Sequence, residues 1–240
     1  MTAYSGKTNQ DDNTNSKQDT GVEDWMTQIW DWIDNHNIAG SSDSTVPREP
    51  EALRQLERLD LGYGKSTSYS YIDNKSVLLS ESESTEPLPG AIGYLKNLKY
   101  LRLRGFNELP EEIAQLDSLE TLVYMNCAFT EFPKVLCKLK NLKALKIFSK
   151  SLERLPNELG NLSSLTHFDM RGTQVQELPD SIGNLKQLKS LGLYHNGLQS
   201  LPDSVTNLKA LEQLDVTENS LSDVSEAVSR FMAGVDGKTC

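Results

Sequence analysis

The chain has 240 residues, 37% of them hydrophobic, and a formal net charge of −10 at neutral pH. This apolar content suffices for a substantial core, whereas the acidity and the absence of a dense basic stretch argue against a nucleic-acid partner, whose phosphates need several cations. No window approaches the roughly 18 uninterrupted apolar residues of a membrane span, so no membrane partner is expected either.

The first 21 residues are rich in Ser, Thr, Asn, Gln and Asp. Such a segment cannot bury enough apolar surface to fold alone, so residues 1–21 are predicted to be a disordered polar tail. They lack the apolar core of a secretory signal peptide, and the odd set of three cysteines (Cys127, Cys137 and Cys240) favours a reducing, cytoplasmic compartment. The export signals of bacterial effectors share this polar composition, so a secreted effector without a cleavable signal peptide is the alternative.

Residues 22–45 are predicted to form an N-terminal helical cap. Trp25, Ile29 and Trp32 follow the i, i+4, i+7 spacing of an apolar helix face. Such a helix can cover the first coil of the repeat array that follows, because that coil has no preceding neighbour. The helix carries acidic residues and no basic ones: Glu23, Asp24, Asp31 and Asp34. Anionic lipid would repel it, which argues against a membrane-surface helix.

A repeating unit fills most of the remaining chain. Each unit opens on a Leu-Pro pair or a close variant, and the example from Leu178 reads LPDSIGNLKQLKSLGLYHNGLQS. The units begin at Val46, Leu88, Leu109, Phe132, Leu155, Leu178 and Leu201, with a truncated unit at Val224. From Leu109 onward the starts are 23 residues apart, and a fixed period of this size with leucines at fixed offsets indicates a solenoid.

The offsets within each unit, counted from its first residue as zero, predict the path of the chain. Apolar residues at offsets 13 and 15 have strand spacing, with both side chains on one face. Apolar residues at offsets 4, 7 and 10 are spaced by three, which suits tight helical or 3₁₀ turns on the return path. The apolar residues of a single coil do not offset the conformational entropy lost when that coil is ordered. Neighbouring coils must therefore stack to make one continuous core.

The pattern resembles the 23-residue LPxxIxxLxxLxxLxLxxNxLxx class of bacterial leucine-rich repeats over residues 88–224. This resemblance implies an α/β fold: a right-handed solenoid with a parallel β-sheet on its concave side and short helical or 3₁₀ returns on its convex side. It also implies that offset 18 lies inside the turn after the strand and satisfies backbone groups of neighbouring coils. Cys127, Thr173, Asn196 and Asn219 fit that role.

Two units depart from the pattern at offset 18. Phe106 and Lys150 stand where Asn, Cys or Thr is expected, so the polar ladder should be irregular there. The last unit also ends early, since Val228 and Phe231 continue its apolar spacing but no strand follows. Residues 224–240 are therefore predicted to be a C-terminal cap and tail.

The leucine-rich repeat domain is predicted to span residues 46–223, with an insertion at 62–87. The starts at Val46 and Leu88 are 42 residues apart, well over one period. Tyr69 and Tyr71 on one side of Asp73-Asn74, and Val77 and Leu79 on the other, predict a β-hairpin, which an acidic segment at 81–87 follows. The insertion can be a functional loop, because loops that interrupt a regular array often carry function. It can equally be an insertion without a role, because surface loops accommodate extra residues at little cost in free energy.

The sequence contains no catalytic or metal-binding constellation. Its three histidines, His36, His167 and His195, lack any HExxH spacing, and there is no paired CxxC. The chain is therefore predicted not to be an enzyme and to need no cofactor or metal.

The side chains that point outward from the strands suggest a binding face. Met125, Phe148 and Tyr194 share offset 16, and aromatic residues, methionine and arginine are enriched in protein interfaces. The candidate concave-face residues are Arg102, Arg104, Met125, Lys146, Phe148, His167, Asp169, Arg171, Tyr194 and His195. The sequence thus predicts a non-enzymatic protein-interaction module, a monomer or weak homodimer, that binds a protein partner on this face. The alternatives are a secreted bacterial effector that binds a host protein and a structural protein that self-assembles through the same face.

Overall fold

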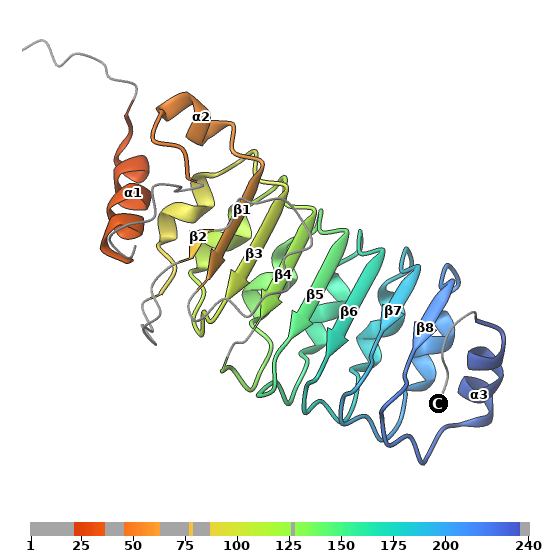
Figure 1. Ribbon diagram of the computed structural model, residues 1–240. Coiled ribbons are helices and arrows are strands. Elements are labelled where there is room, and N and C mark those ends of the chain that lie inside the picture. The colour runs from red at the N-terminus through yellow and green to blue at the C-terminus, as the bar shows by residue number, and fades with distance from the viewer. Residues whose placement is uncertain (1–21, 37–45, 63–76, 79–86, 126–127, 236–240) are drawn as a thin grey trace, which may run out of the picture.

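A single parallel β-sheet with helices along one side forms the body of the protein (Figure 1). The computed structural model describes residues 22–36, 46–62, 77–78, 87–125 and 128–235. The strands are β1 (Arg58–Gly62), β2 (Val77–Leu78), β3 (Tyr100–Arg104), β4 (Thr121–Met125), β5 (Ala144–Phe148), β6 (His167–Arg171), β7 (Ser190–Gly192) and β8 (Gln213–Asp215). Their order across the sheet is β2-β1-β3-β4-β5-β6-β7-β8, so the strands from β3 onward stack in the order of the chain.

The returns between these strands are short 3₁₀ helices, as the three-residue spacing predicted. They are η1 (Gly90–Tyr94), η2 (Glu111–Gln115), η3 (Lys134–Lys138), η4 (Asn157–Asn161), η5 (Asp180–Asn184) and η6 (Asp203–Asn207). Each begins directly after the proline of its Leu-Pro pair, or of Phe132-Pro133 for η3, and that proline has extended backbone angles. The first return is instead the short α-helix α2 (Pro50–Arg54).

The core lies between the sheet and the returns. From β3 to β8 the residues at offsets 13 and 15 are at most 1% exposed, so the predicted inward pair is confirmed in every coil. Strand residues at the even offsets point to the opposite face, here called the concave face. This alternation follows from the two-residue period of a strand. The predicted α/β solenoid is confirmed.

The helix α1 (Asp24–His36) closes the N-terminal end of the solenoid (Figure 1). Met26 and Ile33 are fully buried, and the Trp25 ring stacks on Tyr94 of η1 with centroids 5.7 Å apart. The cap therefore packs on η1, which is the return of the second repeat. The helix α2 forms the return of the first repeat. At the other end α3 (Glu226–Ala233) packs against η6 and buries Val228.

Two asparagines at offset 18 form the expected polar ladder inside the turns. Asn196 donates from Nδ2 to the carbonyl oxygens of Met170 (2.9 Å) and Leu193 (2.7 Å), and its Oδ1 accepts from the Thr173 hydroxyl at 2.7 Å. Asn219 likewise donates to the carbonyl of Leu193. Because these carbonyls are turned away from water, each amide satisfies groups that would otherwise be buried without partners.

Aromatic packing replaces this ladder where Phe106 occupies offset 18. Phe106 is buried, and its carbonyl accepts a hydrogen bond of 2.7 Å from the hydroxyl of Tyr124 in the next coil. The Trp32 ring of the cap lies 6.1 Å from Phe106, and Phe129 stacks on Tyr124 at 5.0 Å. The irregular ladder predicted here is therefore a change of hydrogen-bond donor: the Tyr124 hydroxyl donates to a turn carbonyl, as the asparagine amide does in the later coils.

The insertion contributes an unpredicted feature: β2 pairs in parallel with β1 at the edge of the sheet. Tyr69, Tyr71 and Leu79 of the predicted hairpin lie outside the described residues, as do the tail 1–21, most of the acidic segment 81–87 and the end of the chain. Cys127 also lies outside them. Cys137 is a free, buried cysteine, and desolvation raises the pKa of its thiol to about 12, so the thiol stays protonated and packs as an apolar group.

The glycine at offset 17 offers a clean test of backbone strain. Gly172 has a φ of +65°, and a Cβ added there would meet no atom within 4 Å. Gly172→Ala should therefore cost about 1 kcal/mol through its backbone angle alone. Gly197→Ala is the control, because that glycine has no positive φ and its Cβ would make ordinary contacts from 3.4 Å. Equal urea midpoints for the two variants would contradict this account.

Candidate protein-binding face

The sheet register aligns four of the predicted residues across neighbouring strands. Arg104, Met125, Phe148 and Arg171 are successive partners from β3 to β6. Met125 and Phe148 are half-buried, so each keeps apolar surface in contact with solvent. Tyr194, the fifth member of the predicted column, follows β7 by two residues and is 40% exposed. The sheet therefore presents Met125 and Phe148 side by side between two arginines.

A hollow of about 410 Å³ lies on the concave face over β5 to β8. Its lining includes Lys146, His167, Asp169 and Arg171, and Gly192 leaves room in its middle. A Cβ at Gly192 would lie only 3.0 Å from Oδ1 of Asp169, so a side chain there would be crowded and would fill the hollow. Sequence reasoning did not single out Gly192, although a glycine within a column of side chains is the signal of such a gap.

A second hollow, of about 390 Å³, adjoins the first where the strands end. It is lined by Phe148, Arg171 and His195, together with residues of the turns that hold the asparagine ladder. Arg171 lines both hollows, so it stands at their boundary. Seven of the ten candidate residues thus gather between β5 and the turn after β7: Lys146, Phe148, His167, Asp169, Arg171, Tyr194 and His195.

An ion pair fixes Arg171 at this boundary. Its Nε lies 2.6 Å from Oδ1 of Asp169. That hydrogen bond raises the pKa of the Arg171 guanidinium, and the charges of Asp169 and Asp215 add to the effect. Since half of the side chain is still exposed, Arg171 can donate to a partner from its remaining N–H groups.

The two histidines take different positions beside the hollows. His167 is exposed on β6, and its Nδ1 lies 2.9 Å from the hydroxyl of Thr166. His195 has a φ of 54° and occupies the same offset as Gly172, and its ring lies 5.8 Å from that of Tyr194. Within the described ranges, no three His, Cys, Asp or Glu residues are grouped so that they could hold a metal ion.

The N-terminal end of the concave face is occupied by contacts within the chain. Arg102 pairs with Asp60 of β1 at 2.8 Å, and both side chains are largely buried. The Arg58 guanidinium lies over the Tyr100 ring, 3.6 Å from its centroid. Arg102 was predicted as a binding residue, but the structure places it in this ion pair, away from the two hollows. Arg104, two residues further along β3, remains half-exposed.

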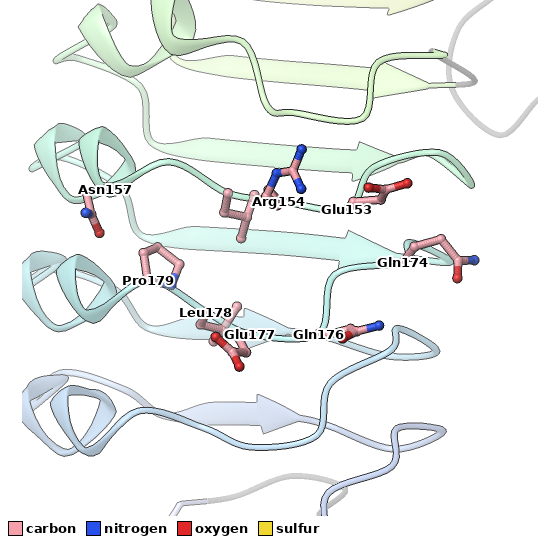
Figure 2. A pocket seen from close by; sticks show the side chains of 9 residues that line it. Glu153, Arg154, Asn157, Gln174, Gln176, Glu177, Leu178 and Pro179 are labelled. Carbon is pink, nitrogen blue, oxygen red and sulfur yellow. The ribbon is translucent and has the colours of Figure 1, made fainter.

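A further hollow, of about 690 Å³, lies on the flank of the solenoid rather than on the concave face (Figure 2). Glu153 and Arg154 of one coil and Gln176 and Glu177 of the next lie along it, and Arg154 is held by Glu131 at 2.9 Å. The lining contains no aromatic residue and none of the predicted binding residues. It therefore lacks the aromatic anchors that carry most of the binding energy in protein interfaces.

Comparison with known proteins defines the class of the fold. A family model described as a leucine-rich repeat region matches residues 77–170. None of the curated proteins matches the chain significantly. In the part of the chain that the structure describes, no helix is both long and apolar enough to cross a bilayer.

Two solved bacterial structures show the same architecture. A leucine-rich repeat protein of Leptospira interrogans superposes with a TM-score of 0.65 at 26% identity, and the match covers 88% of this chain and 56% of that one. Internalin C2 of Listeria monocytogenes superposes with a TM-score of 0.52 at 20% identity, covering 76% of this chain and 71% of that one. The chain therefore spans little more than half the length of the Leptospira protein. These findings show that residues 77–170 match a leucine-rich repeat region and that the chain has the fold of bacterial leucine-rich repeat proteins.

Proposed function

We propose that the chain is a non-enzymatic interaction module that binds a protein partner on the concave face between β3 and the turn after β7. Leucine-rich repeat folds commonly mediate protein–protein interaction. The observation that supports this face in particular is the row of Met125 and Phe148, half-exposed and in register between Arg104 and Arg171. Aromatic, methionine and arginine side chains are the types that anchor such interfaces.

The rigidity of the sheet favours binding through this face. Strands β3 to β7 are each hydrogen-bonded to a neighbour on both sides, so their outward side chains stand on a fixed backbone. A surface that is already ordered loses little conformational entropy when a partner docks. The proposed compartment is the cytoplasm, which agrees with the free thiol of Cys137. Secretion as an effector would deliver the same face to a host protein.

The double variant Phe148→Ala/Tyr194→Ala tests this proposal. Because both side chains are partly exposed, their loss should change the free energy of unfolding by less than about 1 kcal/mol. If both are anchors, binding of the partner should weaken by about 2–4 kcal/mol. Thermal melting and capture of interacting proteins are measured on the same preparations.

The matched control is Lys140→Ala/Lys209→Ala, which removes two exposed side chains from the convex side. This control should retain every captured protein. Proteins captured equally by both double variants would contradict a concave-face site. A change of oligomeric state in the Phe148/Tyr194 variant alone would favour self-assembly through the face instead.

A further inference from the structure

Two cations on the concave face differ from the ion-paired arginines beside them. Among the residues that the structure describes, neither Arg104 of β3 nor Lys146 of β5 forms an ion pair, whereas Arg102 and Arg171 both do. The carboxylate beside Lys146 belongs to Asp169, its register partner on β6, and that group is taken by Arg171. Among the side chains that the structure describes, therefore, no carboxylate pairs with either cation, although the chain as a whole has a net charge of −10.

An apolar strip separates these two cations. Arg104 pairs in register with Met125, and Lys146 pairs with Val123, so both strands flank the same two residues of β4. Val123 is 7% exposed and Met125 is half-buried, and Phe148 lies two residues from Lys146 along β5. Two strand spacings across the sheet and two residues along it place the Cα atoms of Arg104 and Lys146 about 12 Å apart.

We propose that this part of the concave face binds an extended acidic segment of the partner, with the pattern acidic–x–apolar–x–acidic. In an extended chain, residues i, i+2 and i+4 point to one side, and the outer two lie about 13 Å apart. The two carboxylates would then reach Arg104 and Lys146 while the apolar side chain rests on Val123 and Met125. This inference rests on the proposed function and adds the chemistry of the partner.

A protein segment suits the face better than a nucleic acid does. Asp60 and Asp169 on the same sheet face already neutralise Arg102 and Arg171, so these two arginines offer little net charge to a continuous phosphate backbone. A segment with two carboxylates at one spacing can meet the two free cations and avoid these aspartates. The contact would depend on ionic strength, because Lys146 is exposed and Arg104 is half-exposed.

Selection from a phage-displayed library of random heptapeptides on the immobilised full chain tests the proposal. Selected peptides are synthesised, and their affinity is measured for the wild type and for three variants. Arg104→Glu/Lys146→Glu reverses the two concave cations, and Lys140→Glu/Lys209→Glu makes the same change of net charge on the convex side. Phe148→Ala reports whether a peptide occupies the concave face at all. Melting curves establish that each variant is folded.

The proposal expects peptides that depend on Phe148 to carry acidic residues four apart around an apolar residue. Reversal of Arg104 and Lys146 should weaken their binding about tenfold or more, while the convex reversal changes it less than about twofold. Peptides that depend on Phe148 but bind the concave reversal equally well would overturn the acidic-segment proposal and leave the concave face as a binding site. A selection without Phe148-dependent peptides, or with tighter binding of a single-stranded oligonucleotide than of any peptide, would overturn it as well.

Discussion

Replacing Met26 and Ile33 together by alanine should unfold the N-terminal end of the solenoid. Both side chains are fully buried where α1 covers η1. Truncating a buried Met or Ile to alanine costs about 2–5 kcal/mol, so the pair should cost about 4 kcal/mol or more. That loss approaches the whole stability of a typical domain. Repeats contact only their neighbours, so the damage should begin at β1 and β3 and leave β6 to β8 protected for longer.

Hydrogen exchange followed by mass spectrometry measures this gradient directly. The control is Thr27→Ala/Gln28→Ala, which truncates two exposed positions of the same helix and should leave exchange unchanged. A cooperative melt identical to wild type in the Met26/Ile33 variant would show that α1 is not needed as a cap. Equal loss of protection at β1 and β8 would instead mean that the array unfolds as one unit.

The second large effect is expected on the convex side, where the 3₁₀ helices stack closely. A Cβ at Gly160 of η4 would lie 2.5 Å from the carbonyl oxygen of Ser181 in η5, and one at Gly93 would lie 2.5 Å from that of Glu112. Real Cβ atoms do not approach backbone so closely, so Gly160→Val should force the two coils apart. The overpacking should cost about 2–3 kcal/mol in the free energy of unfolding.

Urea denaturation of Gly160→Val is compared with that of Asn161→Ala, an exposed position next to it in η4. The asparagine variant should change stability by less than about 0.5 kcal/mol. A wild-type urea midpoint for Gly160→Val would contradict this account, because it would mean that η4 and η5 can move apart without loss of stability.

The periodic part of the fold was predictable because each coil repeats the same physical problem. Apolar residues at offsets 13 and 15 must face the core, and the leucines spaced by three must line the return, so counting alone predicted β3 to β8 and the 3₁₀ helices. The tryptophans of α1 predicted the cap for the same reason, since a terminal coil needs cover. The small residue at offset 5, which includes Gly160, carries no apolar signal, and its role follows only from the distance between coils.

Features that depend on contacts between different coils were less accessible to sequence reasoning. Phe106 breaks the polar pattern, but only the structure reveals that the Tyr124 hydroxyl reaches its carbonyl. The parallel pairing of β2 with β1 joins a segment inside the insertion to the strand that precedes it, and no local pattern encodes it. In both cases the partner is set by three-dimensional stacking rather than by spacing along the chain.

The sequence predicted which residues of the candidate binding face align across the strands, but not their ion pairs or the hollows between them. Offset counting placed Met125 and Phe148 together, and the register agrees. It did not distinguish Arg102, which Asp60 neutralises, from Arg104, which has no such partner among the described residues. The hollow around Gly192 was not predicted either, because the prediction rested on residue types that are enriched in interfaces, and glycine is not one of them.

Site-specific photocrosslinking tests the central claim, that the concave face contacts a protein partner, most directly. A benzophenone amino acid is placed at Phe148 on the concave face and, separately, at Gln176 on the flank shown in Figure 2. The account predicts that irradiation gives a covalent adduct with a partner protein from position 148 and none from position 176. Adducts from position 176 alone, or in equal yield from both positions, would contradict it.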